Sequence, residues 1–301
     1  MSAAFPPLEI AGRKVPPSML GELVAADPEG DLAAQLDQHG YLLLRSALEA
    51  GEVAAARAEV LARLAEVGEI AAPVADAIAS GTSRRSELYP DLGAFWRSVS
   101  EGPALRRVSH GPLLAGLMER LWGGPVAALD FLWLRAMARG KASPLHVDHP
   151  YMNRGTDRLA TAWIPLGEVG LEEGPLFMLE GSHRLAELRT RFAGLDIDRQ
   201  PGAKGHVEEH PIDFARAHGC RFLTTRFLPG DCMVFSMFTA HAAFDNGSAG
   251  GRVRLSCDCR WQPAGEPMDE RFAGPDPRAH GGKGYGCLMA ARPLGETLAL
   301  R

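Results

Sequence analysis

The segment Pro144–Pro150, with the sequence PLHVDHP, places an imidazole and a carboxylate two positions apart. Residues two apart on a strand point to the same face, so a strand here would bring His146 and Asp148 together and turn Val147 away. One metal ion could then bind both side chains. A third ligand from elsewhere in the chain would complete one face of an octahedron and leave three positions open.

His241 is the candidate for the third ligand, because it follows a turn and an apolar strand. The turn signal is Pro229–Asp231, and the apolar run Cys232–Phe238 comes next. Two histidines and one carboxylate are typical of non-haem iron(II) oxygenases, whose open metal positions take substrate and dioxygen. A satisfied core histidine at the end of a strand is the alternative for His241.

The elements that must position these residues change in character along the chain. Over residues 1–126 we expect mainly helix, with apolar residues at helical spacing in Glu52–Val67 and Leu113–Trp122, and one short strand at Tyr41–Leu44. Beyond residue 127, short apolar segments alternate with Gly, Pro and Asp turns, which favours an antiparallel sandwich or barrel over a parallel sheet. These segments are Phe131–Ala138, Leu159–Leu166, Leu176–Leu179, Cys232–Phe238 and Val253–Trp261.

We therefore expect a single domain over 1–301, mainly β with flanking helices. The helical segment 1–126 would pack on a β core at 127–262. A polar insert at 185–222 interrupts the strand pattern, and inserts of this length in a compact domain are usually functional or mobile. The segment 263–301, rich in Gly, Pro and Arg, is expected to wrap the core with little regular structure.

Composition narrows the function classes. The 32 basic and 37 acidic residues give a formal charge of −5, and no long basic run occurs, which argues against a nucleic-acid or anionic-membrane partner. No stretch has the roughly 18 to 20 apolar residues that cross a bilayer, and no secretion signal opens the chain, so we expect a cytoplasmic protein. The oligomeric state stays open. The cysteines are scattered and lack a CxxC pair, which predicts free thiols: Cys220, Cys232, Cys257, Cys259 and Cys287.

Four motifs in order, HVD, DRLATAWIPLGEVGLEEGPLFMLEGSHR, LPGDCMVFSMFTAH and RVRLSCDCRWQP, resemble the phytanoyl-CoA dioxygenase family of iron(II)- and 2-oxoglutarate-dependent oxygenases. The resemblance covers about 130–262 and, more weakly, the strand and helix expected at 40–67. It implies a double-stranded β-helix core (a jelly roll, cupin-like), with the metal in its mouth. His146, Asp148 and His241 match the ligands of the family.

The resemblance also implies an arginine that binds the far carboxylate of 2-oxoglutarate. Counting from His241 selects Arg252, whereas the downstream RLSxDxRW pattern selects Arg254, with Ser256 as its partner; we favour Arg254. A guanidinium is the apt group, because it can grip a carboxylate through two hydrogen bonds and offset its buried charge. Thr161 and Trp163 are further candidates for contact with 2-oxoglutarate, because they lie on the strand that borders the co-substrate pocket in relatives, although core packing also explains Trp163.

The expected function is oxygenation of an unactivated C–H bond in a small molecule. The cofactors would be iron(II), 2-oxoglutarate and dioxygen, and the products would include succinate and carbon dioxide. No catalytic group beyond the metal centre is predicted, and the substrate-binding residues stay unknown. Because Asp148 is present, hydroxylation is favoured over halogenation. A non-redox metal-dependent enzyme and a catalytically silent binding module on the same fold are the alternatives. His149 should face away from the metal and be structural.

Overall fold

The computed structural model describes residues 5–140 and 142–295, so both outermost ends of the expected domain lie outside the described residues. The strands are β1 (Glu9–Ile10), β2 (Arg13–Lys14), β3 (Leu20–Glu22), β4 (Tyr41–Leu44), β5 (Val126–Ala128), β6 (Trp133–Met137), β7 (Ala160–Pro165), β8 (Leu176–Leu179), β9 (Phe222–Thr224), β10 (Cys232–Ser236), β11 (His241–Ala243) and β12 (Arg254–Pro263).

The helices lie mostly in the first half of the chain. The α-helices are α1 (Leu32–His39), α2 (Ala50–Glu66), α3 (Arg85–Leu88), α4 (Leu92–Ser100), α5 (Pro103–His110), α6 (Pro112–Trp122), α7 (Ala186–Phe192) and α8 (Pro211–Ala217). The 3-10 helices are η1 (Pro17–Met19), η2 (Val74–Asp76), η3 (His149–Tyr151), η4 (Ser182–Arg184), η5 (Glu270–Phe272), η6 (His280–Gly282), η7 (Gly284–Cys287) and η8 (Met289–Ala291).

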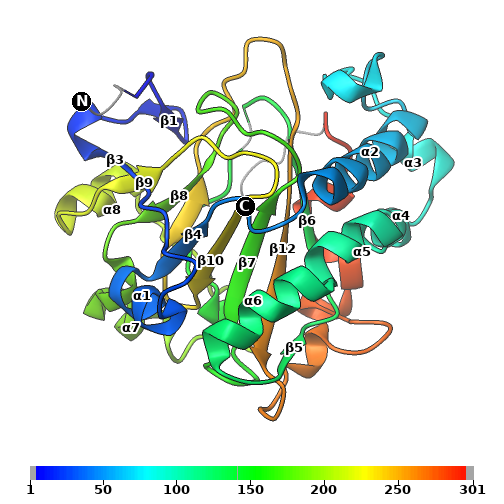
Figure 1. The fold of residues 1–301 in the computed structure, drawn as a ribbon. Coiled ribbons are helices and arrows are strands. Elements are labelled where there is room, and N and C mark those ends of the chain that lie inside the picture. The colour runs from blue at the N-terminus through cyan, green and yellow to red at the C-terminus, as the bar shows by residue number, and fades with distance from the viewer. Residues whose placement is uncertain (1–4, 141, 296–301) are drawn as a thin grey trace.

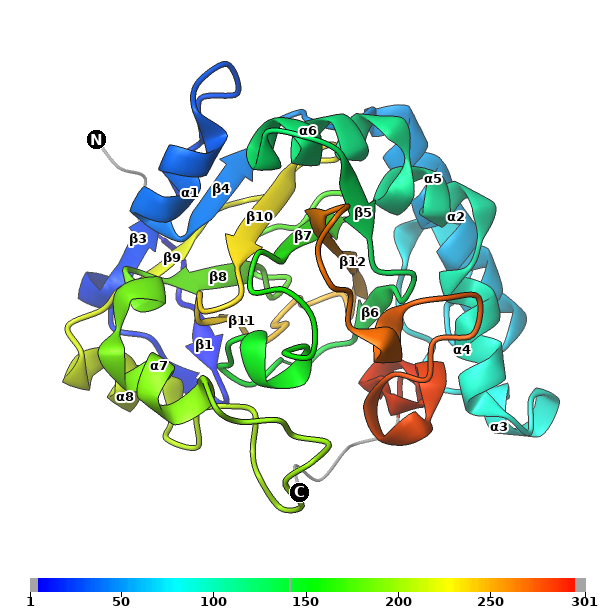
Figure 2. The same ribbon diagram turned by 90° about the horizontal axis from the view of Figure 1, so that it is seen from below.

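Two sheets face each other. The larger has the order β4-β10-β7-β12-β5, with β6 also paired to β12, and all of its pairings are antiparallel. The smaller has the order β11-β8-β9-β3. In Figure 1, α2, α4, α5 and α6 lie along one side of the larger sheet, while α7 and α8 lie on the side of the smaller sheet. Figure 2 shows the same arrangement from below. The predicted mainly-β jelly roll with flanking helices is confirmed.

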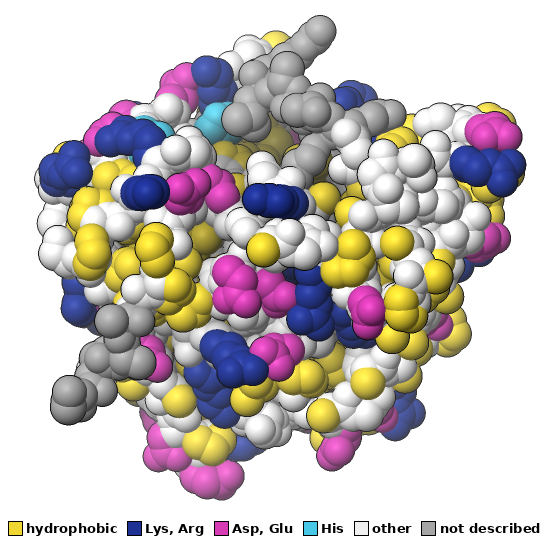
Figure 3. All heavy atoms as spheres, turned by 90° about the horizontal axis from the view of Figure 1, so that it is seen from above, with side chains coloured by type: hydrophobic (Ala, Val, Ile, Leu, Met, Phe, Trp, Pro, Cys, Tyr) yellow, Lys and Arg dark blue, Asp and Glu magenta, His cyan; other side chains and the backbone are white. Residues whose placement is uncertain are grey.

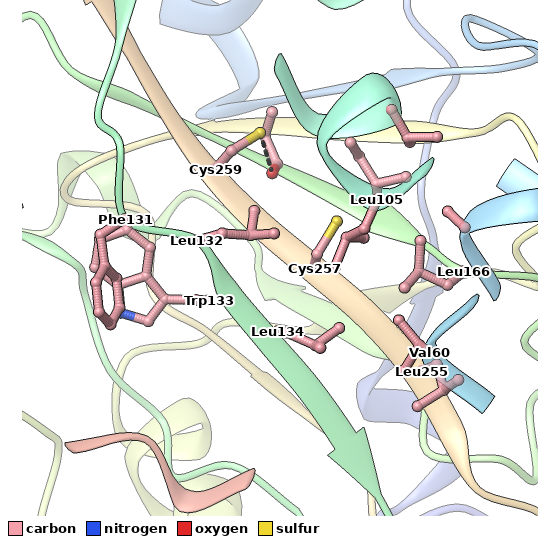
Figure 4. Close-up of a cluster of buried hydrophobic side chains, with 14 of the residues drawn as sticks. Val60, Leu105, Phe131, Leu132, Trp133, Leu134, Leu166, Leu255, Cys257 and Cys259 are labelled. Carbon is pink, nitrogen blue, oxygen red and sulfur yellow. Dashed lines mark hydrogen bonds between the residues drawn. The ribbon is translucent and has the colours of Figure 1, made fainter. Parts of the chain in front are cut away.

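Strand β12 shows how the sequence pattern separates core from site. Its odd-numbered residues Leu255, Cys257 and Cys259 face the helices and pack in the largest apolar cluster, together with Val60 of α2 and Leu105 of α5 (Figure 4). Successive side chains of a strand point to opposite faces. The even-numbered residues of β12 must therefore face the space between the two sheets.

Those inward-facing residues are polar and buried. Arg254, Ser256, Asp258 and Arg260 are each at most 4% exposed. The inner face of the larger sheet is apolar at its other end, where Tyr41, Leu43, Trp163, Met233 and Phe235 pack against the smaller sheet. The barrel interior is thus divided into an apolar region and a charged region. The four buried polar side chains at alternate positions of β12 need hydrogen-bond or charge partners within the barrel.

The cysteines bear out the expectation of free thiols. All five are unpaired, and Cys220, Cys232, Cys257 and Cys259 are buried. Burial raises the pKa of the Cys257 and Cys232 thiols well above the ordinary value, so these side chains behave as small apolar groups.

The insert 185–222 is more regular than the polar pattern indicates. It contains α7 and α8, whose apolar residues pack on the outer face of the smaller sheet: Leu188, Phe192, Ile212 and Phe214 with Phe177 and Phe222. The described residues of the C-terminal segment hold only the 3-10 helices η5 to η8 and contact α4 and β6.

A cluster of ion pairs, in which Asp196 and Asp269 are buried, joins three segments that are distant in the sequence. Arg271, from η5, contacts Asp198 at 2.6 Å and Asp269 at 2.6 Å. Arg154, shortly after the HVD motif, contacts Asp196 at 2.7 Å. The side chain of Arg271 is 10% exposed and that of Asp269 is 2% exposed. These contacts fasten the insert and the C-terminal segment to the loop that follows the metal motif.

Gly40 ends α1 in a left-handed conformation, with a φ of 78° and its N–H bonded to the carbonyl of Leu36. A Cβ at this position would lie 2.4 Å from Nδ1 of His183, whose Nε2 is fixed on the carbonyl of Asp37 at 3.0 Å. Alanine would meet both the unfavourable conformation and the imidazole.

We expect Gly40→Ala to lower the free energy of unfolding by about 2–3 kcal/mol in urea denaturation. Gly68→Ala is the matched control, because Gly68 has a φ of 75° and nothing within 4 Å of the added Cβ. It should cost only about 1 kcal/mol. Equal losses in the two variants would show that His183 does not restrict position 40.

The surface agrees with the balanced composition. On the face seen in Figure 3, basic and acidic side chains are intermixed. Among the described residues, none of the helices is both long enough and apolar enough to cross a bilayer.

Candidate metal centre

The three predicted ligands lie together. Oδ1 of Asp148 is 3.7 Å from Nε2 of His146 and 3.8 Å from Nε2 of His241, and the three donor atoms lie within 4.8 Å of one another. Two donors that are each about 2.1 Å from one ion can be up to about 4.2 Å apart, so a single metal ion can bridge Asp148 to each imidazole. All three residues are buried.

The local structure of the motif differs from the expected strand. His146 forms only isolated bridges, to His206 and to His241, and Asp148 has helical angles (φ −76°, ψ −24°) just before η3. The bridge to His241 is closed by two backbone hydrogen bonds, of 3.1 Å and 2.9 Å. It therefore joins the two ligand histidines directly. Val147 does point away, into the apolar cluster outside the smaller sheet.

Both imidazoles are oriented through Nδ1. His146 Nδ1 lies 2.8 Å from the carbonyl of Pro144, and His241 Nδ1 lies 2.9 Å from the carbonyl of Thr239. A carbonyl only accepts, so each Nδ1 carries the proton and each Nε2 keeps a free lone pair. Burial lowers the pKa of His146 to about 3 and also lowers that of His241. Neutral imidazoles are the form that binds a metal.

The outer oxygen of Asp148 is held separately. Oδ2 accepts a hydrogen bond from Thr161 Oγ1 at 2.5 Å and another from Arg260 Nη2 at 3.2 Å. Burial acts to raise the pKa of Asp148, but the charge of Arg260, the two nearby imidazoles and the hydrogen bond from Thr161 together outweigh it, and the pKa lies well below the usual range. Arg260 is itself fixed over the ring of Trp133, 3.8 Å from the centroid. Asp148 is thus ionised, and its Oδ1 is the oxygen left free to hold a metal ion.

Thr161 thus donates its hydroxyl hydrogen bond to the candidate metal ligand Asp148. The resemblance implied instead that Thr161 contacts 2-oxoglutarate. We expect Thr161→Val, which keeps the shape of the side chain, to weaken Fe(II) or Co(II) binding about 10-fold in anaerobic titration. Thr161→Ser keeps the hydroxyl and should bind within about 2-fold of the wild type. If valine binds metal as well as threonine does, the hydroxyl does not orient Asp148.

A pocket extends from the two ligand histidines along the inner face of β12. It is lined by Arg135, Ser143, His146, Trp163, Leu176, Phe235, His241, Ala243, Arg254 and Asp258. Trp163 packs edge-on against Phe227 at 4.8 Å and lies 5.9 Å from the guanidinium carbon of Arg254. Trp163 therefore both packs in the apolar core and lines the pocket.

Arg254 has no carboxylate partner among the described residues. Its Nη1 donates to Ser256 Oγ at 3.0 Å, and its buried Nε makes no hydrogen bond. Burial and the nearby charge of Arg135 lower the pKa of Arg254 to about 10, so the side chain is charged at neutral pH. A buried guanidinium without an anion is costly, and a carboxylate in the pocket would satisfy it. The donor set and this cation both fit the predicted co-substrate.

Arg252 lies elsewhere. Its side chain is 38% exposed and pairs with Glu173 Oε1 at 3.0 Å, and it does not line the pocket. Of the two arginines that the sequence left open, only Arg254 therefore faces the metal site.

Three charged residues of the site were missed at the level of sequence: Arg135, Asp258 and Arg260. Asp258 and Arg260 continue the two-residue alternation that starts at Arg254 and Ser256, so the strand periodicity could have revealed them. Arg135 is a single charge inside the apolar run Phe131–Ala138, and only its register opposite Ser256 places it in the pocket.

His149, next to Asp148, is turned away from the metal as expected. Its ring stacks on Phe238 with centroids 4.5 Å apart, and its Nε2 lies 3.5 Å from Asp157. It therefore has a packing role.

Comparison with known proteins decides the family. Residues 36–254 match the model of the phytanoyl-CoA dioxygenase (PhyH) family. The chain belongs to this family. It is also 27% identical over 243 residues to the 1-deoxypentalenic acid 11-beta-hydroxylase of Streptomyces exfoliatus, a match that covers 76% of this chain and 79% of the hydroxylase.

Solved structures agree on the fold. The epimerase SnoN from nogalamycin biosynthesis, solved with Fe3+, alpha ketoglutarate and nogalamycin RO, has a TM-score of 0.53 at 22% identity, covering 79% of this chain and 84% of SnoN. The carbocyclase SnoK has a TM-score of 0.52 at 20% identity, covering 84% of this chain and 92% of SnoK. EctD from S. alaskensis has a TM-score of 0.52 at 19% identity, covering 85% of this chain and 84% of EctD.

Membership in the phytanoyl-CoA dioxygenase family, taken with the triad, confirms the predicted cofactors iron(II), 2-oxoglutarate and dioxygen. The chain is an iron- and 2-oxoglutarate-dependent enzyme of the oxygenase type.

Proposed function

We propose that the protein hydroxylates an unactivated C–H bond of a small molecule. His146, Asp148 and His241 would hold iron(II), which, when bound with 2-oxoglutarate and dioxygen, supplies the oxidising power for C–H cleavage. The observation that carries the proposal is the buried triad beside a pocket that ends at an unpaired arginine.

The residues around the metal have separate roles in this proposal. Thr161 and Arg260 occupy Oδ2 of Asp148, so that Oδ1 would be the oxygen available to hold the metal. Arg254 and Ser256 bind the far carboxylate of 2-oxoglutarate and thereby fix which end of the molecule reaches the metal. Trp163 and Phe235 line the pocket between them and exclude water from it.

Hydroxylation is proposed over other outcomes of the same class for two reasons. The relative at 27% identity is a hydroxylase, whereas the epimerase and the carbocyclase resemble this chain in fold at 20–22% identity. Asp148 occupies the carboxylate position, so no metal site is vacated for a halide to be transferred. Neither an epimerisation nor a ring closure would insert oxygen into the product, which makes the outcomes separable.

The insert and the C-terminal segment are proposed to shape the substrate side of the site. Tyr151 packs edge-on against His146 with centroids 5.9 Å apart, and His280 packs against Tyr151 at 5.7 Å. Gly205, in the insert, lies so close to Tyr151 that a Cβ there would be 2.5 Å from the ring. Both segments therefore reach the aromatic residue next to a metal ligand.

The test does not require the substrate. Anaerobic addition of Fe(II) and 2-oxoglutarate to the wild type should produce a weak visible charge-transfer band. His146→Ala should lose this band, whereas His149→Ala, a neighbouring histidine outside the site, should keep it. A band that survives in His146→Ala would show that the ligand assignment is wrong.

A screen of small molecules for stimulated succinate release under ¹⁸O₂ then tests the reaction. Hydroxylation predicts a product that is 16 mass units heavier than its substrate, or 18 with the label. Succinate release with an unlabelled, isomerised or dehydrogenated product would contradict hydroxylation and leave the reaction class intact.

A further inference from the structure

A second guanidinium lies in the metal pocket, and the proposed function does not use it. Arg135 comes from the middle of β6, opposite Ser256 of β12, and lines the same pocket as both ligand histidines and Arg254. Its neighbours on the strand, Leu134 and Ala136, are buried among the helices. Arg135 is therefore the inward-facing residue of this stretch of β6.

Arg135 is anchored on one side and accessible on the other. Its Nε and Nη2 both contact Oδ2 of Asp258, at 2.7 Å and 2.6 Å. The side chain of Asp258 is only 4% exposed, while that of Arg135 keeps 26%. The remaining nitrogen, Nη1, has no hydrogen-bond partner among the described residues. Since Arg135 lines the pocket, part of its accessible surface faces the space in which a ligand would bind.

The formal charges in and around the pocket leave room for one more anion. The formal charges of iron(II), Asp148, Arg254 and dianionic 2-oxoglutarate would add up to zero. Arg135 and Asp258 also cancel. Arg260, which is 1% exposed, then leaves this group of charges with one net positive charge. A buried uncompensated charge is unfavourable, so a ligand that carries a single negative charge would complete the site.

The co-substrate does not supply this anion in the arrangement proposed above. One carboxylate of 2-oxoglutarate would be on the metal and the other on Arg254 and Ser256. We propose that Arg135 binds a carboxylate of the prime substrate, so that the molecule to be hydroxylated is a small monocarboxylic acid. Asp258 is the positioning residue, because it holds the guanidinium with its free edge towards the pocket. This inference rests on the proposed function and deepens it.

The selectivity follows from the geometry of the pair. A guanidinium fixed by one carboxylate offers its other edge to a second planar anion, which an ester or an amide of the same shape cannot match in charge. A dianion such as a phosphate monoester would turn the excess of one positive charge into one negative charge. The site therefore favours a carboxylate over both neutral and doubly charged analogues.

The experiment measures binding without turnover. Protein loaded with Mn(II) and saturated with 2-oxoglutarate is mixed with acetate, benzoate or cyclohexanecarboxylate, and the paramagnetic relaxation of the probe protons is recorded by NMR. The matched amides serve as neutral probes. At least one acid should relax much faster than its amide. Arg135→Gln should reduce that effect at least about 10-fold, and Arg252→Gln, which changes an arginine outside the pocket, should leave it within about 2-fold.

Each other result counts against the proposal. It is overturned if none of the three acids relaxes faster than its amide, or if Arg135→Gln retains the effect. Affinity for 2-oxoglutarate is measured in parallel by calorimetry and should stay within about 3-fold in Arg135→Gln. A loss of at least about 10-fold would show instead that Arg135 binds the near carboxylate of the co-substrate.

Two further controls separate the loss of carboxylate binding from a loss of folding. Arg135→Gln leaves the buried Asp258 with only the longer contact to Arg260, at 3.8 Å, so the double variant Arg135→Gln/Asp258→Asn, which removes both charges, is measured beside it. Thermal melting of both variants checks that each is folded. If the wild type fails to bind Mn(II) or 2-oxoglutarate, the proposed function itself fails, and this result is distinct from a lack of carboxylate binding.

Discussion

Replacing Arg254 with methionine is expected to weaken 2-oxoglutarate binding at least about 100-fold, because the far carboxylate would be buried without a cation. Methionine fills most of the volume of the arginine side chain, so the barrel should remain folded. Arg254→Lys should recover only some of the affinity, since an ammonium cannot form the two parallel hydrogen bonds of a guanidinium. Calorimetric titration of the metal-loaded protein measures the three affinities.

Arg252→Met is the matched control for this prediction. Arg252 stands two positions earlier in the sequence but pairs with Glu173 outside the pocket. Its replacement should change the affinity for 2-oxoglutarate by no more than about 3-fold, as expected for a partly exposed ion pair. A larger loss in Arg252→Met than in Arg254→Met would reverse the assignment.

The second large effect is expected in stability. Arg271→Met should lower the free energy of unfolding by about 3 kcal/mol, because it leaves the buried Asp269 and the partly buried Asp198 without the cation that both contact. Urea denaturation followed by circular dichroism measures the loss. Arg158→Met is the control: Arg158 also contacts the C-terminal segment, through Glu266, but its side chain is 53% exposed, and its loss should cost less than about 1 kcal/mol.

The same cluster predicts an acid-sensitive contribution to stability. Burial acts to raise the pKa of Asp196, but the hydrogen bond from Arg154 and the charge of Arg271 outweigh it and lower the pKa to about 2. A carboxyl whose pKa is lower in the folded than in the unfolded state stabilises the fold above the unfolded pKa and loses that effect as the pH falls through the folded pKa. Wild-type stability should therefore drop between about pH 4 and pH 2, and Arg271→Met should show a shallower drop. Equal slopes would exclude the cluster as the cause.

Much of the site could be predicted from the sequence because its ligands lie in local patterns. The HVD motif and the turn-strand-histidine segment each place a donor beside a strong local signal, and Arg254 follows from its position in β12. The expected strand at His146 was wrong, because this residue forms only isolated bridges, to His241 of β11 and to His206 in the insert. Such partners are set by tertiary structure and leave no local periodicity.

The missed elements have a similar explanation. Helices α4 and α5 are short and separated by only two residues, and they are stabilised by burial of Phe95, Trp96 and Leu105 against α2 and the tail rather than by a long periodic pattern. The role of Arg135 depends on the register between β6 and β12, which joins residues more than 100 positions apart in the chain. A charge in an apolar run signals that something is unusual, but its partner becomes visible only across the sheet.

The alternation along β12 has a consequence for how this enzyme can diversify. A deletion of one residue between Arg254 and Arg260 would turn over the part of β12 on one side of it, so that polar side chains there would face the helices and apolar ones the inside of the barrel, and core and site would be disrupted together. The Gly250–Gly251 turn before the strand carries no such coupling. Insertions and deletions should therefore be tolerated there during evolution, and new substrates are expected to arise by remodelling around a strand whose length cannot change.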